Sequence, residues 1–304
     1  MKKKNRFGAI DIGSYNCRLI IVEKIDDVVK VLDFISFENN LIKNLTYNNE
    51  FTSKNISKTL GCLKLFSEKL YEHNVKKYRC IATEACRQVI NPEFFIDSVH
   101  NATGINVEII SSNEEARLSL KSCSSYMNKF DNDGLIFDIG GGSTELSLFH
   151  LNSQKMLTRS ISYGVINLSE KIEIFGLENV NTKLNIHFSQ FKKNLPENKD
   201  GFLAIGSCST VTTLCAIFQN LNVFDLNKIE GFEMSSDDLI KTLQYVRKLT
   251  VSQKKKNPCI GRRHALITNG IEILDVLLNK VPIKRIIATQ KGLKDALINE
   301  ISLK

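Results

Sequence analysis

The sequence predicts an α/β protein built from two duplicated domains with a cleft between them. The chain has 304 residues, more than one typical domain needs and enough for two domains that each have a core. Two similar segments, residues 7–15 and 135–143, open the two halves of the chain, and each half continues with strand and helix patterns in mixed order. We expect an N-terminal domain at 1–127 and a C-terminal domain at 128–304.

The similarity of the two segments extends to their surroundings. Each is an apolar strand ending in Asp-Ile-Gly, with the aspartates at Asp11 and Asp138, followed by a turn of small residues and a second apolar strand (17–22 and 145–149). The aspartates lie about one domain length apart, so duplication of a domain explains them better than chance does.

The patterns after each hairpin predict the remaining elements in order. In the first half, apolar residues at helical spacing predict a helix around 56–70, and Pro92 and Gly104 delimit a helix at 92–103. Further elements of this half are strands at 78–82 and 105–110 and a helix at 113–127. The second half is expected to contain strands at 202–205 and 285–288, helices at 209–219, 235–249 and 261–278, and a final helix.

Composition and charge limit the classes of function. Hydrophobic residues make up 42% and charged residues 24% of the chain, as in a soluble globular protein. The net charge of +8 favours anionic partners such as polyphosphate, nucleotides, nucleic acid or a membrane surface. A solvated lysine-rich surface explains the charge equally well. The densest basic cluster combines Lys254–Lys256 with Arg262 and Arg263.

The eight cysteines are dispersed and contain no Cys-x-x-Cys pair. A zinc site would need clustered ligands, and a disulfide framework is typical of smaller secreted chains. We therefore expect reduced core cysteines. Because no segment has the length of a membrane span, the sequence predicts a cytoplasmic protein.

The second hairpin carries the sharpest motif, Asp138-Ile-Gly140-Gly141-Gly142-Ser143-Thr-Glu145. Three consecutive glycines let the backbone approach a ligand, and successive N–H groups form an anion-binding concavity. It is no dinucleotide fingerprint, because a strand follows and not a helix. A simple tight turn would need only two residues such as Asn-Gly. We therefore predict that Gly140, Gly141, Gly142 and Ser143 bind phosphate.

Two other loops extend this site. Asp11-Ile-Gly-Ser14 repeats the device, with Ser14 able to donate to a phosphate oxygen. Asp11 and Asp138 beside a polyanion would need a cation, for which Mg²⁺ is the usual choice and another divalent ion an alternative. Gly206 and Ser207 join a strand to a helix start, a weaker phosphate-binding signal.

The three loops, in this order, resemble those of the superfamily of actin, the heat-shock chaperones and the sugar kinases, which has ribonuclease-H-like domains. Ala82-Thr-Glu-Ala-Cys-Arg87-Gln, Ile109-Ile-Ser-Ser-Asn-Glu114-Glu115-Ala-Arg117 and the glycine hairpin resemble the signatures of the exopolyphosphatase/guanosine pentaphosphate phosphatase family. The similarity runs from Ala9 to about Gly292, and the chain resembles the short, two-domain members.

This resemblance implies hydrolysis of a phosphoanhydride and not phosphoryl transfer to a sugar. It assigns Glu115 as the base that activates water, Asp138 and Glu145 as cation-binding or water-positioning groups, and Arg87 as a phosphate contact. The leading substrate is inorganic polyphosphate and the alternative is guanosine pentaphosphate. No nucleic acid partner is expected, and formation of a homodimer is left open.

Glu114 and Glu115 also allow a structural explanation. Ser111–Glu114 and Ser112–Glu115 both have the spacing of a capping box at a helix start. Because neighbouring helix residues face about 100° apart, one division of roles is that Glu114 caps the helix while Glu115 points into the cleft.

The sequence departs from the family pattern at Tyr15, Ser209, Ala265 and Gln290. An asparagine is usual at the first position, a glycine at the second and acidic residues at the last two. These departures keep open a protein that binds polyphosphate or nucleotides with weakened catalysis. A sugar kinase or an actin-like ATPase would give no reason for Glu114-Glu115-Ala-Arg117.

Overall fold

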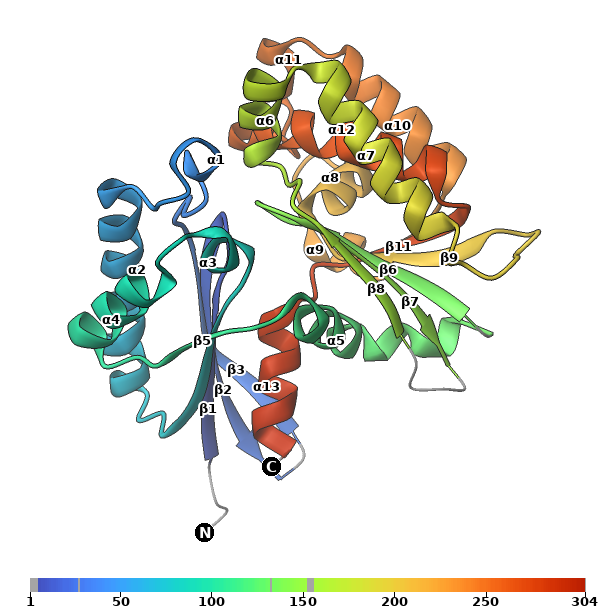
Figure 1. Ribbon diagram of the computed structural model, residues 1–304. Helices are drawn as coiled ribbons and strands as arrows, with labels where there is room; N and C mark the ends of the chain where they lie inside the picture. The colour runs from blue at the N-terminus through green and yellow to red at the C-terminus, as the bar shows by residue number, and fades with distance from the viewer. Residues whose placement is uncertain (1–4, 27, 132, 152–155, 304) are drawn as a thin grey trace. The chain divides into compact units, whose positions relative to one another are not determined.

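The protein forms two compact α/β units (Figure 1), described by a computed structural model over residues 5–26, 28–131, 133–151 and 156–303. The first unit runs to Ser122 and takes up the chain again from Gly292, whereas the second comprises Cys123–Lys291. Each unit is a mixed β-sheet with helices, which confirms the predicted α/β class with two domains.

The domain boundaries differ from those expected. The first boundary falls at Ser122, five residues before the expected one at 127. The C-terminal helix α13 (Leu293–Leu303) belongs to the first unit, although all of 128–304 was assigned to the second. The physical reason is burial: Ala296 and Leu297 of α13 are fully buried in one apolar cluster with Ala9 and Val22 of the first sheet.

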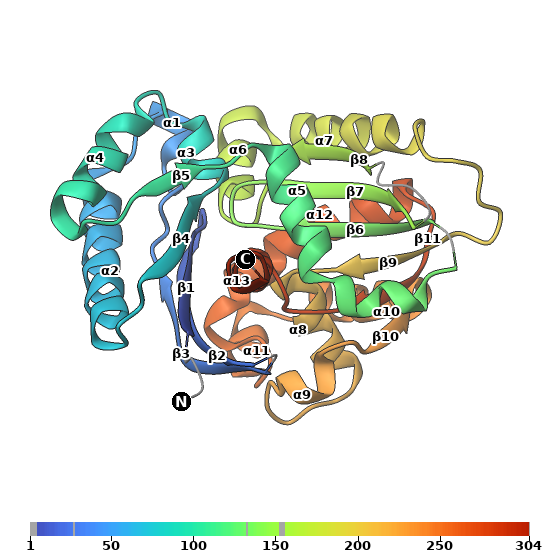
Figure 2. The same ribbon diagram turned by 90° about the horizontal axis from the view of Figure 1, so that it is seen from below.

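The first unit contains a five-stranded sheet in the order β3-β2-β1-β4-β5. Its strands are β1 (Asn5–Ile12), β2 (Asn16–Ile25), β3 (Val28–Glu38), β4 (Lys77–Ala82) and β5 (Val107–Ile109). The first three strands pair antiparallel, while β1, β4 and β5 run parallel. Its other helices are α1 (Leu45–Asn48), α2 (Ser53–Glu72), α3 (Glu84–Gln88), α4 (Pro92–Thr103) and α5 (Ser112–Ser122). Figure 2 shows α2 and α4 on one face of this sheet and α13 on the other.

The second unit contains a six-stranded sheet in the order β10-β11-β9-β6-β7-β8. The strands are β6 (Asp133–Ile139), β7 (Thr144–His150), β8 (Met156–Ile161), β9 (Phe202–Gly206), β10 (Glu233–Ser235) and β11 (Ile283–Ala288). The helices are α6 (Asn167–Phe175), α7 (Leu177–Lys192), α8 (Ser209–Phe218), α9 (Leu226–Ile229), α10 (Ser236–Lys248), α11 (Val251–Lys256) and α12 (His264–Lys280), with 3₁₀ turns η1 (Ser124–Lys129) and η2 (Gly261–Arg263).

The two sheets share one topology, which supports the duplication. The order β3-β2-β1-β4-β5 in the first unit corresponds to β8-β7-β6-β9-β11 in the second. The hairpins also share a register: Asp11 lies opposite Arg18 in β1/β2, and Asp138 lies opposite Glu145 in β6/β7. In both hairpins the aspartate stands next to the last residue of its strand, so the turn starts at the same place.

Local sequence signals explain several element ends. The predicted helix at 92–103 is α4, with Pro92 in its first turn and Gly104 at φ 70° behind its last residue. This left-handed conformation strains any residue with a Cβ, which is why the helix ends at a glycine. The helix expected at 113–127 is shorter, because α5 ends at Ser122 and the chain continues as η1.

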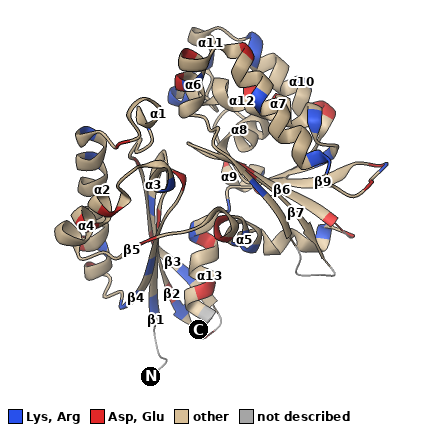
Figure 3. Ribbon diagram, in the orientation of Figure 1, with Lys and Arg blue, Asp and Glu red and all other residues tan. Residues whose placement is uncertain are grey.

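Basic and acidic residues are interspersed over both units (Figure 3). The predicted basic cluster is weaker than expected, since Lys254 is buried and donates from Nζ to Oγ1 of Thr268 at 3.1 Å. All eight cysteines are buried and free, as expected for core residues. Within the described ranges, no helix combines the length and the apolar character needed to cross a bilayer.

The packing of α13 yields a stability prediction. We expect Leu297→Ala to destabilise the protein by about 2–5 kcal/mol, because it removes a fully buried side chain and leaves a cavity. Leu177→Ala is the matched control, since Leu177 is 57% exposed and should change stability by no more than about 0.5 kcal/mol. Urea unfolding of both variants checks this, and equal effects would contradict the assignment of α13 to the first core.

Candidate phosphate and catalytic site

The turn of the second hairpin is held by its carbonyl groups. Val165 and Ile166 donate their N–H groups to the carbonyls of Gly140 and Gly141, both at 2.9 Å. The carbonyl of Gly142 accepts from Nδ2 of Asn167 at 2.8 Å. The carbonyl of Ser143 accepts from the N–H of Gly140 at 2.9 Å. Each of the four turn carbonyls therefore has a protein donor.

The N–H groups of the same turn, unlike its carbonyls, lack hydrogen-bond partners among the described residues at three positions. Among the described residues, no acceptor lies within hydrogen-bond geometry of the N–H groups of Gly141, Gly142 and Ser143. Buried or partly buried N–H groups are almost always paired with protein, water or a ligand. Three consecutive N–H groups without a protein acceptor are thus available to an anion, in agreement with the predicted phosphate site.

Two carboxylates lie immediately below this turn. Asp138 and Glu145 are direct cross-strand neighbours in β6/β7, so their side chains emerge on the same face. Glu145 is buried and accepts from Oγ of Ser160 at 2.9 Å. Because like charges directly opposite each other are destabilising, this pair favours a cation between or beside the two groups.

The first hairpin is held in the same way. Asn39 donates from Nδ2 to the carbonyl of Gly13 at 3.2 Å, and Ile42 donates its N–H to the carbonyl of Ser14 at 3.1 Å. The carbonyl of Tyr15 accepts from the N–H groups of Asn39 and Asn40 at 2.9 and 3.0 Å. The segment behind β3 therefore serves hairpin one as the segment behind β8 serves hairpin two.

Asp11 of the first hairpin has a basic partner where Asp138 has an acidic one. Nη1 of Arg18 donates to Oδ2 of Asp11 at 3.3 Å, whereas Oδ1 of Asp11 is buried and has no partner among the described residues. Burial raises the pKa of Asp11, and the charges of Arg18 and Lys294 offset only part of this rise. Asp11 is thus a carboxylate with one oxygen left for a further ligand.

Glu115 lies in a buried cluster with Arg87 and Glu84. Nη1 of Arg87 donates to Oε2 of Glu115 at 2.8 Å, and Nε and Nη2 donate to Oε2 of Glu84 at 3.2 and 2.8 Å. Nη1 also donates to the carbonyl of Ile110 at 2.9 Å. Burial lowers the pKa of Arg87, but Glu115 and Glu84 outweigh this effect and raise it above the ordinary value. Two predicted site residues, Glu115 and Arg87, are therefore in direct contact.

Glu114 does not act as the expected cap. Ser111 caps α5, because its Oγ accepts from the N–H of Glu114 at 3.2 Å. The Glu114 carboxylate instead pairs with Arg117 at 2.7 Å and with Arg79 at 3.5 Å. The hydrogen bond from Arg117 lowers the pKa of Glu114. The capping half of the prediction was wrong, since two guanidinium groups compete with one backbone N–H for this carboxylate.

The third loop uses most of its donors inside the protein. The N–H of Ser207 donates to the carbonyl of Phe137 at 2.9 Å, and its Oγ donates to the carbonyl of Lys291 at 2.5 Å. A Cβ on Gly206 would lie 2.8 Å from Cγ2 of Val211, so only glycine fits there. Ser207 could bind phosphate only by releasing one of these bonds. Ser209 is exposed at the first position of α8, and Cys208 precedes it as the cap residue.

The predicted residues share a position in each sheet. Asp11 lies at the carboxyl end of β1, and Arg87 and Glu115 follow the carboxyl ends of β4 and β5, which run parallel to β1. Asp138 and Gly206 lie at the carboxyl ends of β6 and β9, also a parallel pair. Ligand sites of open α/β sheets lie beyond the carboxyl ends of parallel strands.

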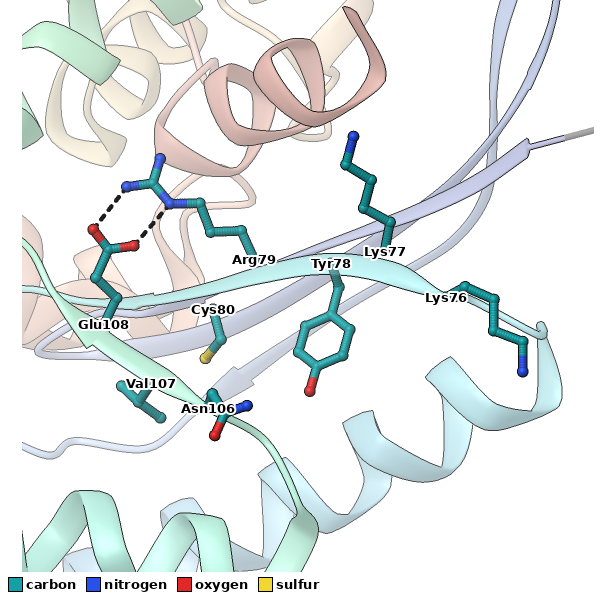
Figure 4. Close-up of a pocket in the computed structure, with 8 residues that line it drawn as sticks. All are labelled: Lys76, Lys77, Tyr78, Arg79, Cys80, Asn106, Val107 and Glu108. Atoms are coloured by element: carbon teal, nitrogen blue, oxygen red, sulfur yellow. Dashed lines mark hydrogen bonds and ion pairs between the residues drawn. The ribbon is translucent and has the colours of Figure 1, made fainter. Parts of the chain in front are cut away.

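A hollow of about 440 Å³ lies at the other end of the first sheet (Figure 4). It is lined by the amino ends of β4 and β5 and bordered by the ion pair between Arg79 and Glu108. None of the predicted site residues lines it.

Whether a divalent cation fits the protein depends on the carboxylate side chains that could bind it. Within the described ranges, no three His, Cys, Asp or Glu side chains come close enough to hold a metal ion by themselves. Two carboxylates stand side by side at Asp138 and Glu145, and Asp11 has a buried oxygen without a partner. The pair Asp138 and Glu145 is a donor set that suits Mg²⁺, which is usually held by one or two carboxylates together with waters and substrate phosphates.

Sequence reasoning missed five residues that shape the site, namely Arg18, Asn39, Glu84, Ser160 and Asn167. Superposing the two repeats would have found Arg18, because it occupies the place of Glu145. Asn39 and Asn167 each lie in the segment behind the third strand of their unit, but nothing in the local pattern marks a buried asparagine.

A comparison with known protein families now identifies the chain. Residues 20–304 match the Ppx/GppA phosphatase family. The chain belongs to this family. The resemblance inferred from the three loops and from Glu114-Glu115-Ala-Arg117 is thereby confirmed.

Curated relatives of this Ppx/GppA protein are longer than the chain. It is 30% identical over 297 residues to a bifunctional 3-dehydroquinate synthase/phosphatase of Fusobacterium nucleatum, covering 91% of this chain and 44% of that protein. It is 29% identical over 165 residues to a guanosine-5'-triphosphate,3'-diphosphate pyrophosphatase of Vibrio atlanticus, covering 54% of this chain and 33% of that protein. The chain thus spans less than half the length of either relative.

Solved structures agree on the fold. An exopolyphosphatase from Cytophaga hutchinsonii superposes with a TM-score of 0.83 at 22% identity over 97% of both chains. The Ppx/GppA family member of Aquifex aeolicus has a TM-score of 0.79 at 23% identity, covering 99% of this chain and 98% of that one. The predicted α/β fold with two domains is therefore that of the solved Ppx/GppA structures.

The raised pKa of Asp11 leads to a pH-dependent prediction. Since folding raises this pKa, Asp11 costs no stability below the ordinary carboxyl pKa and costs more as the pH rises through the raised value. Asp11→Asn lacks this cost. We expect its melting temperature to exceed that of the wild type near pH 7, and the gain to shrink near pH 4. Thermal melts at both pH values check this, and a lower melting temperature near pH 7 would contradict burial as the dominant cause.

Proposed function

We propose that this protein is a metal-assisted phosphoanhydride hydrolase that removes the terminal phosphate from inorganic polyphosphate. The observation that carries the proposal is the second hairpin, where three N–H groups without an acceptor among the described residues lie in the turn between two cross-strand carboxylates. Such N–H groups donate hydrogen bonds to phosphate oxygens, and the carboxylates would bind the cation that accompanies a polyanion. The proposed phosphate contacts are Gly140–Ser143, Ser14, Gly206 and Ser207, the last of which would first have to release one of its own hydrogen bonds.

Glu115 is proposed as the general base that takes the proton from the attacking water. It is a buried carboxylate whose Oε2 accepts a hydrogen bond from Nη1 of Arg87 at 2.8 Å. Four hydrogen bonds from Arg87 go to Glu115, Glu84 and Ile110, so one N–H at Nη2 is left for a phosphate oxygen.

The other residues handle charge and position. Asp138 and Asp11 would hold Mg²⁺, which would neutralise the phosphate oxygens and the leaving group. Glu145, fixed by Ser160, would orient the attacking water or a water of the cation shell. The N–H groups of Gly141, Gly142 and Ser143 would donate hydrogen bonds to phosphate oxygens and stabilise the negative charge on them during hydrolysis.

A guanosine pentaphosphate is the second substrate candidate, supported by the similarity to the pyrophosphatase of Vibrio atlanticus. The chemistry would be the same, and the difference would lie in a nucleoside pocket. Phosphate release from long polyphosphate, tripolyphosphate and guanosine pentaphosphate, with and without Mg²⁺, separates the candidates. Turnover of guanosine pentaphosphate alone would replace the first proposal, and binding without turnover would indicate a protein with weakened catalysis.

Substitution of Glu115 is the sharpest test of the mechanism. Glu115→Gln keeps the size and one hydrogen-bond acceptor for Arg87 but cannot take a proton. We expect hydrolysis to fall by about 10²–10⁴-fold, with polyphosphate binding retained. Steady-state kinetics and calorimetric binding measure the two effects.

Glu114→Gln is the matched control on the same helix. It loses ion pairs with Arg117 and Arg79 on a part-exposed surface, so it should cost about 0.2–1 kcal/mol of stability and leave turnover intact. If Glu114→Gln abolishes turnover while Glu115→Gln does not, the roles are exchanged. If neither does, this mechanism fails.

Substitution of Asp138 tests the cation. Asp138→Asn should reduce turnover by about 10²-fold or more and raise the Mg²⁺ concentration needed for half-maximal rate, because it removes one of two adjacent carboxylates. Asp133→Asn is the control on the same strand, since Asp133 pairs with Nδ1 of His150 at 2.6 Å. Cation titrations of both variants check this, and equal Mg²⁺ dependence would remove Asp138 from the cation site.

A further inference from the structure

In each unit a buried asparagine from the segment behind the third strand contacts the turn of the hairpin. Asn39 follows β3 and Asn167 follows Ile161 of β8 by a short loop, and both are fully buried. Each donates from Nδ2 to a carbonyl in the turn of its own hairpin, Asn39 to Gly13 at 3.2 Å and Asn167 to Gly142 at 2.8 Å. Burying an amide side chain costs free energy unless it is hydrogen-bonded. A buried asparagine that contacts the hairpin turn in both units therefore indicates a role in holding that turn.

We propose that Asn39 and Asn167 are positioning residues that hold the two glycine hairpins in their anion-binding conformation. This inference rests on the proposed function for its ligand, a chain of phosphates. A peptide group presents its N–H on the side opposite its carbonyl. An amide side chain that fixes the carbonyl of Gly142 inside the protein therefore directs the N–H of the next residue, Ser143, away from that side.

The surroundings of Asn167 reinforce this role. Its Oδ1 accepts from the N–H of Gly164 at 2.8 Å, and Nδ2 also donates to the carbonyl of Ser162 at 3.3 Å. Asn167 thus ties the glycine turn to the segment 162–166, which itself holds Gly140 and Gly141. A Cβ on Gly164 would lie 2.5 Å from the backbone of Gly141 and Gly142, so the two segments pass so close to each other that position 164 has no room for a side chain.

In the first unit the same arrangement is less complete. Asn39 contributes both its side chain to Gly13 and its N–H to Tyr15, at 3.2 and 2.9 Å. Its Oδ1 is buried and has no partner among the described residues. A buried acceptor without a donor costs free energy. That cost is consistent with selection of an amide at this place for its donor.

The test combines a ligand-free and a ligand-bound measurement. Asn167→Ala should accelerate hydrogen exchange at Val165 and Ile166, whose N–H groups bond the turn carbonyls, without ligand present. In the Glu115→Gln background, which prevents turnover, the Kd for tripolyphosphate with Mg²⁺ should rise about 10-fold, an amount in keeping with the loss of one positioned hydrogen bond. Asn39→Ala should weaken binding similarly and should accelerate exchange in residues 39–42 only.

Two further variants keep the outcome interpretable. Gly164→Ala displaces the same turn but keeps the Asn167 side chain, and it should also raise the Kd. This variant replaces Asn167→Ala in the test if Asn167→Ala fails to fold. Asn185→Ala is the control, because Asn185 only donates to Asn181 within α7 and should leave exchange and Kd unchanged.

The two proposals fail in different ways. Unchanged exchange at 165–166 in Asn167→Ala, or an unchanged Kd measured well below the melting temperature, would overturn the positioning role. Accelerated exchange in a protein whose wild type binds no phosphate compound would overturn the proposed function and leave the loop-holding role supported.

Discussion

A row of backbone N–H groups can bind an anion only where the carbonyls of the same peptides are satisfied elsewhere. The second hairpin meets this requirement with donors from one neighbouring segment, Val165 and Ile166 through their backbone and Asn167 through its side chain. The order of the first three strands in each unit suits this requirement. The third antiparallel strand returns the chain to the end of the sheet where the turn of the first two lies, so the segment behind it can reach the turn carbonyls. Duplication then supplies a second hairpin held by the segment behind β3.

The repeats differ where their chemistry differs. Arg18 and Glu145 occupy equivalent cross-strand places, so the first hairpin pairs its aspartate with a cation of its own and the second pairs it with another carboxylate. One oxygen of Asp11 accepts from Arg18 and the other is buried without a partner among the described residues, whereas Asp138 lies opposite a second carboxylate. The duplicated hairpins have therefore diverged in charge, since the two carboxylates of the second hairpin offer a divalent cation more ligands than the Asp11–Arg18 pair of the first does.

Local signals in the sequence were sufficient for much of the fold and for part of the site. Proline and glycine fixed both ends of α4, and the two Asp-Ile-Gly turns fixed the duplication. The edge strand β3 was missed because Val28, Val31 and Phe34 are all exposed, which leaves no alternation to read. The return of α13 to the first unit and the role of Asn167 depend on contacts between distant segments, and no local pattern encodes these. The motifs predicted Glu115 and Arg87 as separate site residues, whereas their 2.8 Å contact joins segments far apart in the sequence and could not be predicted.

The departures from the family pattern fall where the structure uses the backbone or exposes the side chain. Tyr15 contributes its carbonyl to the first hairpin, and Gln290 contributes its N–H to Glu230 at 3.0 Å. Neither contact depends on the side chain that differs. Ser209 and Ala265 are exposed, and Cys208 stands at the cap of α8. The groups that the proposed chemistry needs, Glu115 with Arg87 and Asp138 with Glu145, are retained in contact or in register. The substitutions thus alter the periphery of the site and give no physical reason for lost turnover, which favours a hydrolase over a protein that only binds its polyanion.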